Sequence, residues 1–247
     1  MNPWDALTTE LDAWADQGRQ ASLWWRDDDA VEPSPALDRL LALAQEYDSP
    51  ITLAVIPAHT GKALARYLDD KPTVSLAQHG YSHDNHAPAG AKKIELGGTR
   101  HAGKVVDALS AGQELMAQYF GVAPAMLVPP WNRIAPEVVE QLPALGFATL
   151  SCFADKPDQD DLPAGLARLN THLDPIAWRG DRGFVGDHAA LSPLVAHLRA
   201  QRLDKAVPES AGLLTHHMDH DAAVWQFTEA LIQRVTDHPG ARWVSAA

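Results

Sequence analysis

Cysteine is nearly absent from this chain of 247 residues: Cys152 is the single one, so no internal disulfide can form. Structural disulfides belong to oxidising compartments, and a chain without them fits a reducing one. Long hydrophobic runs are missing too, since no apolar stretch approaches the roughly 20 residues that a membrane-spanning helix needs. The first residues also lack the basic segment and the apolar run of a signal peptide. We therefore expect a cytoplasmic protein that does not enter membranes.

Positive charge is also scarce in this chain. There are 20 Lys and Arg residues against 32 Asp and Glu residues, which leaves a formal net charge of -12 and a pI near 5.3. An acidic surface repels the phosphates of nucleic acids and the headgroups of anionic membranes. We therefore expect a small-molecule or oligosaccharide substrate as the partner, with no nucleic acid and no membrane. Association into a homo-oligomer stays open.

Strand and helix patterns alternate regularly along the chain. The hydrophobic content of 46% suffices for one large core, so we expect a single domain over residues 1–247, capped by a helix within residues 1–20. Periodicity and breaker residues predict the element bounds. The predicted strands are 21–26, 51–56, 73–77, 125–128, 147–151, 167–170, 212–215 and 242–244, and the predicted helices are 3–17, 36–47, 60–69, 101–120, 136–145, 189–203 and 222–237.

Polar residues gather where at least four of the predicted strands end. In a parallel (β/α) barrel, functional residues collect at the carboxyl ends of the strands. A doubly wound open sheet would show a similar alternation, but no Gly-rich phosphate-binding turn follows the first strand. Two stretches, 78–100 and 154–165, are predicted loops, and Glu95-Leu96-Gly97 in the first is a candidate to fold back over a site. We therefore predict an α/β barrel with its site at one rim.

Three histidines, His79, His83 and His86, follow the predicted strand at 73–77 within a few residues. Residues four apart share a face where the backbone turns helically, so His79 and His83 can converge on one point. Neutral imidazole is the commonest nitrogen ligand for zinc. The alternative is that all three are loop residues facing solvent. Their clustering favours a metal site.

The first strand ends in three consecutive carboxylates, Asp27, Asp28 and Asp29. Adjacent carboxylates repel one another, and a bound divalent cation would relieve that repulsion. A helix cap is the alternative interpretation, because Pro33 and Pro35 precede the next predicted helix. A cap needs only one such residue, so the run indicates a carboxylate ligand as well.

Two further strand ends carry residues that are candidates for binding or catalysis. Consecutive prolines after the strand at 125–128 stop ladder pairing and stiffen the loop that presents Trp131 and Asn132. The strand at 212–215 ends in His216 and His217. These groups complete a set of acidic, imidazole and aromatic side chains from separate strand ends.

This set resembles the NodB-type polysaccharide deacetylase family, also called family 4 carbohydrate esterases. The resemblance extends over about residues 22–220 and implies a distorted (β/α)7 barrel. The family pattern has an Asp-Asp pair, a His-x-x-x-His pair, a Pro-Pro-aromatic loop, an Asp/Trp segment and a strand ending in Leu-x-His. In this chain the matching residues are the 27–29 acidic run, His79-Gly-Tyr-Ser-His83, Pro129-Pro130-Trp131, Asp174 with Trp178, and Leu214-Thr215-His216.

The resemblance also implies roles for the acidic run. In the family the first Asp of the pair is the general base and the second binds the metal. The family usually carries an Arg before Pro-Pro that steadies the base, but Val128 stands there in this chain. Arg26 can replace it. Residues i and i+2 of a strand share a face, so Arg26 and Asp28 point the same way. This favours Asp28 as base and Asp29 as ligand, whereas a direct overlay on the family pattern gives Asp27 and Asp28.

The resemblance further implies a ligand set, a cofactor and a proton donor. One divalent ion, zinc first with cobalt, nickel and manganese as alternatives, would be held by Asp29, His79 and His83. His216 would be the general acid, with His217 as the alternative. The residues expected to contact the substrate are Arg26, Pro130, Trp131, Asn132 and Leu214, with His86 as a further candidate.

The function implied by the resemblance is metal-dependent removal of an acetyl group from an N-acetylated sugar or a related small amide or ester. The expected cytoplasmic location and Val128 in place of the family's Arg favour a small substrate. One alternative is therefore a cytoplasmic amide hydrolase of small nitrogen compounds, similar to relatives that act on ureide rings. The other is a non-catalytic carbohydrate-binding barrel, which the retained His79, His83 and His216 disfavour.

Overall fold

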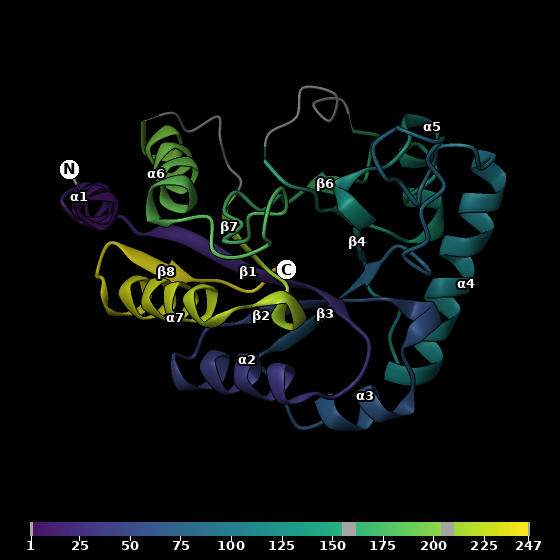
Figure 1. The fold of residues 1–247 in the computed structure, drawn as a ribbon, viewed down its shortest axis with the longest axis horizontal. Helices are drawn as coiled ribbons and strands as arrows, with labels where there is room; N and C mark the ends of the chain where they lie inside the picture. Colours follow the sequence, from purple (N-terminus) through teal and green to yellow (C-terminus); the bar gives the residue numbers. More distant parts are fainter. Residues whose placement is uncertain (1, 155–161, 204–209, 247) are drawn as a thin grey trace. The chain divides into compact units, whose positions relative to one another are not determined.

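The computed structural model describes residues 2–154, 162–203 and 210–246. Part of the predicted loop at 154–165 therefore lies outside the described residues. Strands and helices alternate as the sequence predicts (Figure 1). The strands are β1 (Ala21–Ala30), β2 (Ile51–Val55), β3 (Val74–His79), β4 (Met126–Val128), β5 (Thr149–Leu150), β6 (Ala167–Arg168), β7 (Ala211–Thr215) and β8 (Ala241–Trp243). The helices are α1 (Pro3–Ala15), α2 (Pro35–Glu46), α3 (Lys62–Leu68), α4 (Ala102–Phe120), α5 (Pro136–Val139), α6 (Asp187–Leu203) and α7 (Ala222–Asp237), with short 3-10 turns such as η2 (Pro130–Asn132), η3 (Pro143–Leu145) and η5 (His217–Asp219) between them.

The strands form one sheet in the order β6-β5-β4-β3-β2-β1-β7, and β8 pairs with β1. The pairs β1–β7, β1–β8, β3–β4, β4–β5 and β5–β6 are all parallel. Parallel neighbours need crossover connections, and α4 supplies the one between β3 and β4, and α5 the one between β4 and β5. The predicted fold class, a distorted (β/α)7 barrel, is therefore confirmed. None of the helices in the described ranges is both long enough and apolar enough to cross a bilayer.

Two compact units make up the chain, and β1 passes from one to the other between Asp27 and Asp28. The first unit consists of Met1–Asp27, Ser34–Thr52 and Asn170–Ala247, and the second of Asp28–Pro33 and Leu53–Leu169. Whether 1–247 acts as a single functional domain stays a prediction.

In the first unit, the N-terminal helix packs against two other elements, and its predicted capping role stays a prediction. Helix α1 lies against α6 and β8. Arg202 of α6 donates two hydrogen bonds to the buried carboxylate of Glu10, at 2.6 and 3.0 Å. In the sheet, β1 and β7 run in register so that Arg26 lies opposite Leu214 and Asp27 opposite Thr215. This register places Asp27 beside the last residue of the strand that the histidines follow.

In the second unit, β3 and β4 pair so that His79 lies opposite Val128. The long loop after β3 is well packed: Leu96 is fully buried in the core under α4, and its carbonyl oxygen accepts a hydrogen bond from the N–H of Ala135 at 2.8 Å. Leu96 also forms an isolated parallel bridge with Ile134. The loop is therefore anchored to the fold at this point.

The sequence prediction of one helix over 136–145 is wrong. Helix α5 ends at Val139, and η3 follows at Pro143–Leu145. Pro143 has no N–H to donate and its ring clashes with the carbonyl of residue 139, so an α-helix cannot continue through it. Strand β1 also runs beyond its predicted end at residue 26, through the acidic residues to Ala30.

Candidate functional site

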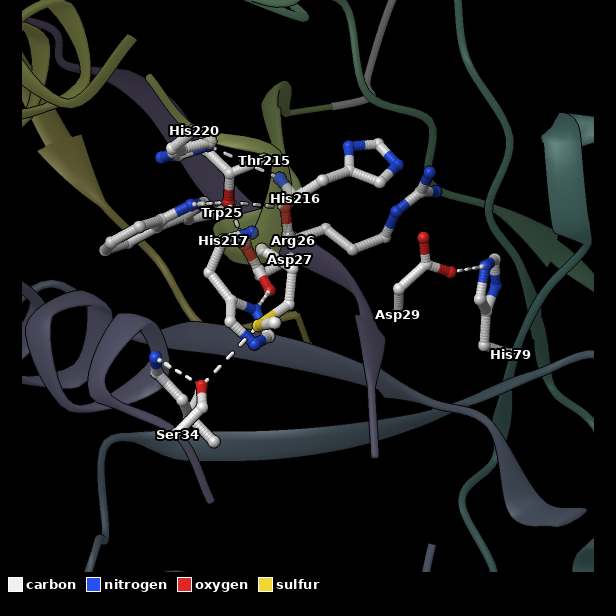
Figure 2. A network of polar contacts seen from close by, with 12 residues as sticks. Trp25, Arg26, Asp27, Asp29, Ser34, His79, Thr215, His216, His217 and His220 are labelled. Carbon is white, nitrogen blue, oxygen red and sulfur yellow. Dashed lines mark hydrogen bonds and ion pairs between the residues drawn. The ribbon is translucent and has the colours of Figure 1, made fainter. Parts of the chain in front are cut away.

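Asp29, His79 and His83 come together in the second unit. Asp29 lies near the end of β1, His79 ends β3, and His83 follows one turn of loop later. Asp29 Oδ1 lies 3.1 Å from His79 Nε2 and 3.4 Å from His83 Nε2, and one ligand atom from each residue lies within 4.8 Å of the others. Figure 2 shows the Asp29 carboxylate directed at the imidazole of His79. The three predicted ligands are therefore close enough to share one cation.

The hydrogen bonding of His79 leaves its other ring nitrogen available to a cation. His79 Nδ1 lies 2.9 Å from the carbonyl oxygen of Val128, so Nδ1 carries the proton and donates it. In a neutral ring, the Nε2 lone pair then faces the Asp29 carboxylate, and two acceptors facing each other need a proton or a metal ion between them. Tetrahedral zinc with ligand bonds of about 2.0–2.1 Å separates its ligand atoms by about 3.3 Å. The observed separations of 3.1 and 3.4 Å fit that geometry.

The surrounding charges act differently on the two imidazoles. Burial alone would lower the pKa of His79, but the carboxylates of Asp28 and Asp29 and the Val128 carbonyl outweigh it and raise that pKa. The pKa of His83 is lowered, chiefly by burial and then by the neighbouring charge of His79. The carboxylates therefore create a negative potential at His79 that also favours a divalent cation.

Backbone strain is concentrated around these residues. Asp29, His83, Trp131 and Asn132 all have positive φ, at 68°, 60°, 54° and 55°. Residues other than glycine rarely adopt this backbone conformation, and each such residue costs about 1–3 kcal/mol of folding free energy. Such strain persists where surrounding contacts hold it, typically at functional sites. Two of the strained residues are candidate ligands and two belong to the aromatic loop.

The predicted aromatic loop lies against the candidate ligands. The Trp131 ring centroid is 4.4 Å from that of His83, and the Lys93 ammonium lies 5.5 Å from the Trp131 ring centre. Pro130 is buried and packs against the backbone of Gly80, where a Cβ atom would overlap its ring. Trp131 therefore covers one side of the His83 imidazole, and Pro130 packs against the turn that precedes it. Contact of these residues and of Asn132 with a substrate stays a prediction.

Asp27 has a different environment from its two neighbours. It is fully buried in the first unit and accepts three hydrogen bonds: 2.6 Å from the Thr215 hydroxyl, 3.0 Å from the His217 N–H and 2.5 Å from His217 Nδ1 (Figure 2). Burial opposes ionisation, but His217 and Thr215 outweigh it and lower the pKa of Asp27. Asp27 therefore holds the turn after β7. Sequence reasoning missed this pair, although strand alternation does place Asp27 on the opposite face from Arg26 and Asp28.

His216, the predicted proton donor, contacts the predicted Asp/Trp segment. The ring of Trp178 meets His216 edge-on at 4.6 Å, and Trp178 Nε1 donates a 2.7 Å hydrogen bond to Asp174. His217, the alternative donor, is buried with its Nδ1 on Asp27. His216 is more accessible than His217, which supports the first choice. The choice itself stays a prediction.

The remaining predicted residues have clear structural positions. Arg26 and Leu214 are buried opposite each other in the β1–β7 ladder. Asp28 is 2% exposed. His86 accepts a 3.3 Å hydrogen bond from Arg100 through its ring. The substrate and base roles of these residues stay predictions.

His220 was not singled out from the sequence, yet its surroundings predict an acid-sensitive contribution to stability. Burial, the largest cause, lowers the pKa of His220 to about 4. An unfolded chain takes up this proton near pH 6.5, so the unfolded state binds more protons between pH 6.5 and 4 and stability falls as the pH falls through that window. The full effect is roughly 3 kcal/mol.

We expect His220→Gln to flatten the pH dependence of the unfolding free energy, measured by urea denaturation, by about this amount. Curves that stay parallel to wild type from pH 7 to 4 would refute the assignment.

Comparison with known proteins bears on the fold. No protein-family model matches the sequence, and no curated protein does. Solved structures do match. A protein from Mycobacterium smegmatis assigned to the polysaccharide deacetylases has a TM-score of 0.66 at 19% identity, over 92% of this chain and 87% of that one. A polysaccharide deacetylase from Bacillus cereus has a TM-score of 0.58 at 16% identity, over 92% and 93%.

A third match is a family 4 carbohydrate esterase from Streptomyces lividans in complex with acetate, with a TM-score of 0.57 at 15% identity, over 90% of this chain and 91% of that one. Each match extends over nearly the whole of both aligned chains, as the sequence resemblance predicts. At these identities the likeness concerns the fold. The chain therefore has the NodB-type polysaccharide deacetylase fold.

Proposed function

We propose that this protein is a metal-dependent hydrolase that removes an acetyl group from an N-acetylated sugar or a related small amide or ester. The observation that carries the proposal is the convergence of Asp29, His79 and His83 within 4.8 Å at the ends of two strands. A carboxylate with two imidazoles is a donor set that zinc takes in hydrolytic enzymes. Cobalt, nickel and manganese are alternatives for the same donors.

The chemistry divides between a cation and side chains of this chain. A divalent ion in such a set polarises a substrate carbonyl and lowers the pKa of water from about 15.7 to around 7. We assign Asp28, next to the ligand Asp29, the role of taking the proton from the attacking water. His216 would give a proton to the leaving amine, which otherwise leaves poorly. His217 is less suited, because it is only 3% exposed.

Side chains beside the candidate ligands would shape the acyl pocket. Trp131 and Pro130 present apolar surface next to His83 and Gly80, which suits an acetyl methyl group. Asn132 offers a polar side chain on the same strained turn. We assign Arg26 and Leu214 supporting roles toward the base and the pocket, as the family resemblance implies. The acetate recorded with the Streptomyces lividans esterase of the same fold supports an acetyl product.

Acetate release tests the proposed reaction. Protein loaded with zinc or cobalt is expected to release acetate from N-acetylated chito-oligosaccharides or small acetylated amines. Chelation should reduce the rate at least about 100-fold, and added metal should restore it, because the cation activates the water. The assay is coupled detection of acetate, with Asp29→Asn protein as the inactive control. An unchanged rate in metal-free protein would contradict metal dependence.

The rival reaction is tested in the same experiment. An amide hydrolase of small nitrogen compounds would open a ureide ring or release ammonia instead of acetate. Ammonia release or ring opening without acetate release would replace the deacetylase proposal by this one. A metal-loaded protein inactive on both substrate classes, yet binding sugars, would point to the carbohydrate-binding alternative.

A further inference from the structure

Glu95 is a fully buried carboxylate in the second unit whose role the reaction does not explain. Its Oε1 accepts hydrogen bonds from the N–H groups of Tyr81 at 3.1 Å and Ser82 at 2.8 Å, and from the Ser82 hydroxyl at 3.3 Å. Its Oε2 accepts from the N–H of His83 at 3.2 Å. Three consecutive N–H groups pointing at one carboxylate form an anion-binding nest. Glu95 thus accepts the N–H groups of the last three residues of the turn that leads from His79 to His83.

The position of Glu95 is itself fixed by the core. Its neighbour Leu96 is fully buried and is bridged to Ile134, and its carbonyl accepts the Ala135 N–H at 2.8 Å. On the other side of the carboxylate, a Cβ atom on Gly80 would overlap Glu95 Oε2. Only glycine leaves room for so close an approach, and Gly80 also has a positive φ of 55°. The carboxylate is therefore held between a packed anchor and the turn it binds.

We propose that Glu95 is a positioning residue for the metal ligands: it holds the turn from Gly80 to His83 in the one conformation that points His83 Nε2 toward Asp29. His83 has a strained φ of 60°, and the bond from its N–H to Glu95 is a contact that maintains that conformation. The inference rests on the proposed function, since it assumes that a cation binds Asp29, His79 and His83. Groups that orient metal ligands typically change metal affinity by 10- to 100-fold.

The test uses metal-free protein and zinc alone. Glu95→Gln keeps the size of the side chain but places an N–H₂ group against N–H donors of the nest, so the turn loses acceptors. Isothermal titration is expected to show zinc affinity lowered 10- to 100-fold. Hydrogen exchange of the amides of Tyr81, Ser82 and His83 in metal-free protein should be at least about 10-fold faster than in wild type.

Glu10→Gln is the matched control. Glu10 is also a buried glutamate, 6% exposed, but it binds Arg202 in the first unit. This change should destabilise the protein while leaving zinc affinity within about twofold and the three amides unaffected. A purely structural role for Glu95 would give the same result as the control, with a lower melting temperature and unchanged affinity, and would overturn the inference.

The remaining outcomes separate this inference from the proposed function. If Glu95→Gln does not fold, Glu95→Asp, which withdraws the carboxylate by one methylene, is expected to lower zinc affinity and expose the same amides. Wild-type affinity in that variant would overturn the inference. If wild-type protein binds no zinc, cobalt, nickel or manganese, the proposed function fails. The amide exchange then still decides whether Glu95 holds the turn, while its link to a metal is overturned.

Discussion

His79→Ala and His83→Ala are each expected to reduce bound metal from one ion per chain to less than about 0.1. In the proposed site each imidazole would supply one of three protein ligands, and the two left by either substitution would not compete with water for zinc. Asp29 Oδ1 lies within 3.4 Å of both Nε2 atoms, so either truncation leaves this carboxylate with a single imidazole beside it. The measurement is elemental analysis of purified protein after loading with one equivalent of zinc.

His188→Ala is the matched control for these substitutions. His188 lies at the start of α6, where its ring contacts Ser192, and it belongs to the first unit. Its loss should leave metal content unchanged. Full occupancy in His79→Ala or in His83→Ala would remove the proposed ligand set, whatever the activity of those variants.

Asp28→Asn is expected to retain metal while hydrolysis falls by about 100- to 10,000-fold, the usual contribution of a general base. Asp29→Asn should instead lose the metal and hydrolysis together, because a neutral amide is a poor substitute for a carboxylate ligand. Metal content and acetate release measured on the same preparations distinguish the two residues. Metal loss in Asp28→Asn combined with metal retention in Asp29→Asn would refute this assignment.

Asp27→Asn completes the series and tests the other register. Asp27 accepts hydrogen bonds from Thr215 and His217 and is fully buried. An amide keeps one acceptor oxygen and turns N–H₂ toward a donor, so the free energy of unfolding should fall by about 1–3 kcal/mol. Metal binding should be unchanged. Loss of hydrolysis with stability preserved would shift the base to Asp27 and the ligand to Asp28.

The register of the acidic run shows where sequence reasoning reached its limit. Alternation along a strand groups Arg26 with Asp28 on one face and leaves Asp27 on the other, which favours Asp28 and Asp29 as base and ligand. The overlay on the family pattern favours Asp27 and Asp28. The hydrogen-bond partners of Asp27 are Thr215 and His217, about 190 positions later in the chain. Local pattern carries no information about such distant contacts.

Local physics was sufficient for most of the architecture. Helix α7 is observed at Ala222–Asp237, the bounds that the sequence predicts, and the side chain of Asp221 caps its first turn. The strand ends that carry His79 and His216 also lie close to where apolar runs stop, whereas β1 continues past its apolar run to Ala30. Each of these features depends on residues within one or two turns of each other. The one wrong helix, 136–145, fails for an equally local reason that the prediction overlooked, the proline at 143.

The amino-acid sequence alone determined the alternating α/β architecture, the strand ends that carry chemistry and the four-residue spacing of His79 and His83, because these depend on short-range periodicity. Only the tertiary structure decided which groups surround each carboxylate. Asp29 lies beside the imidazole of His79, 50 residues later in the chain. Asp27 is hydrogen-bonded to His217 in the turn after β7, and Glu95 accepts a hydrogen bond from the N–H of His83. The physical reason is that a buried carboxylate is defined by the donors around it, and here those donors come from segments that only folding brings together.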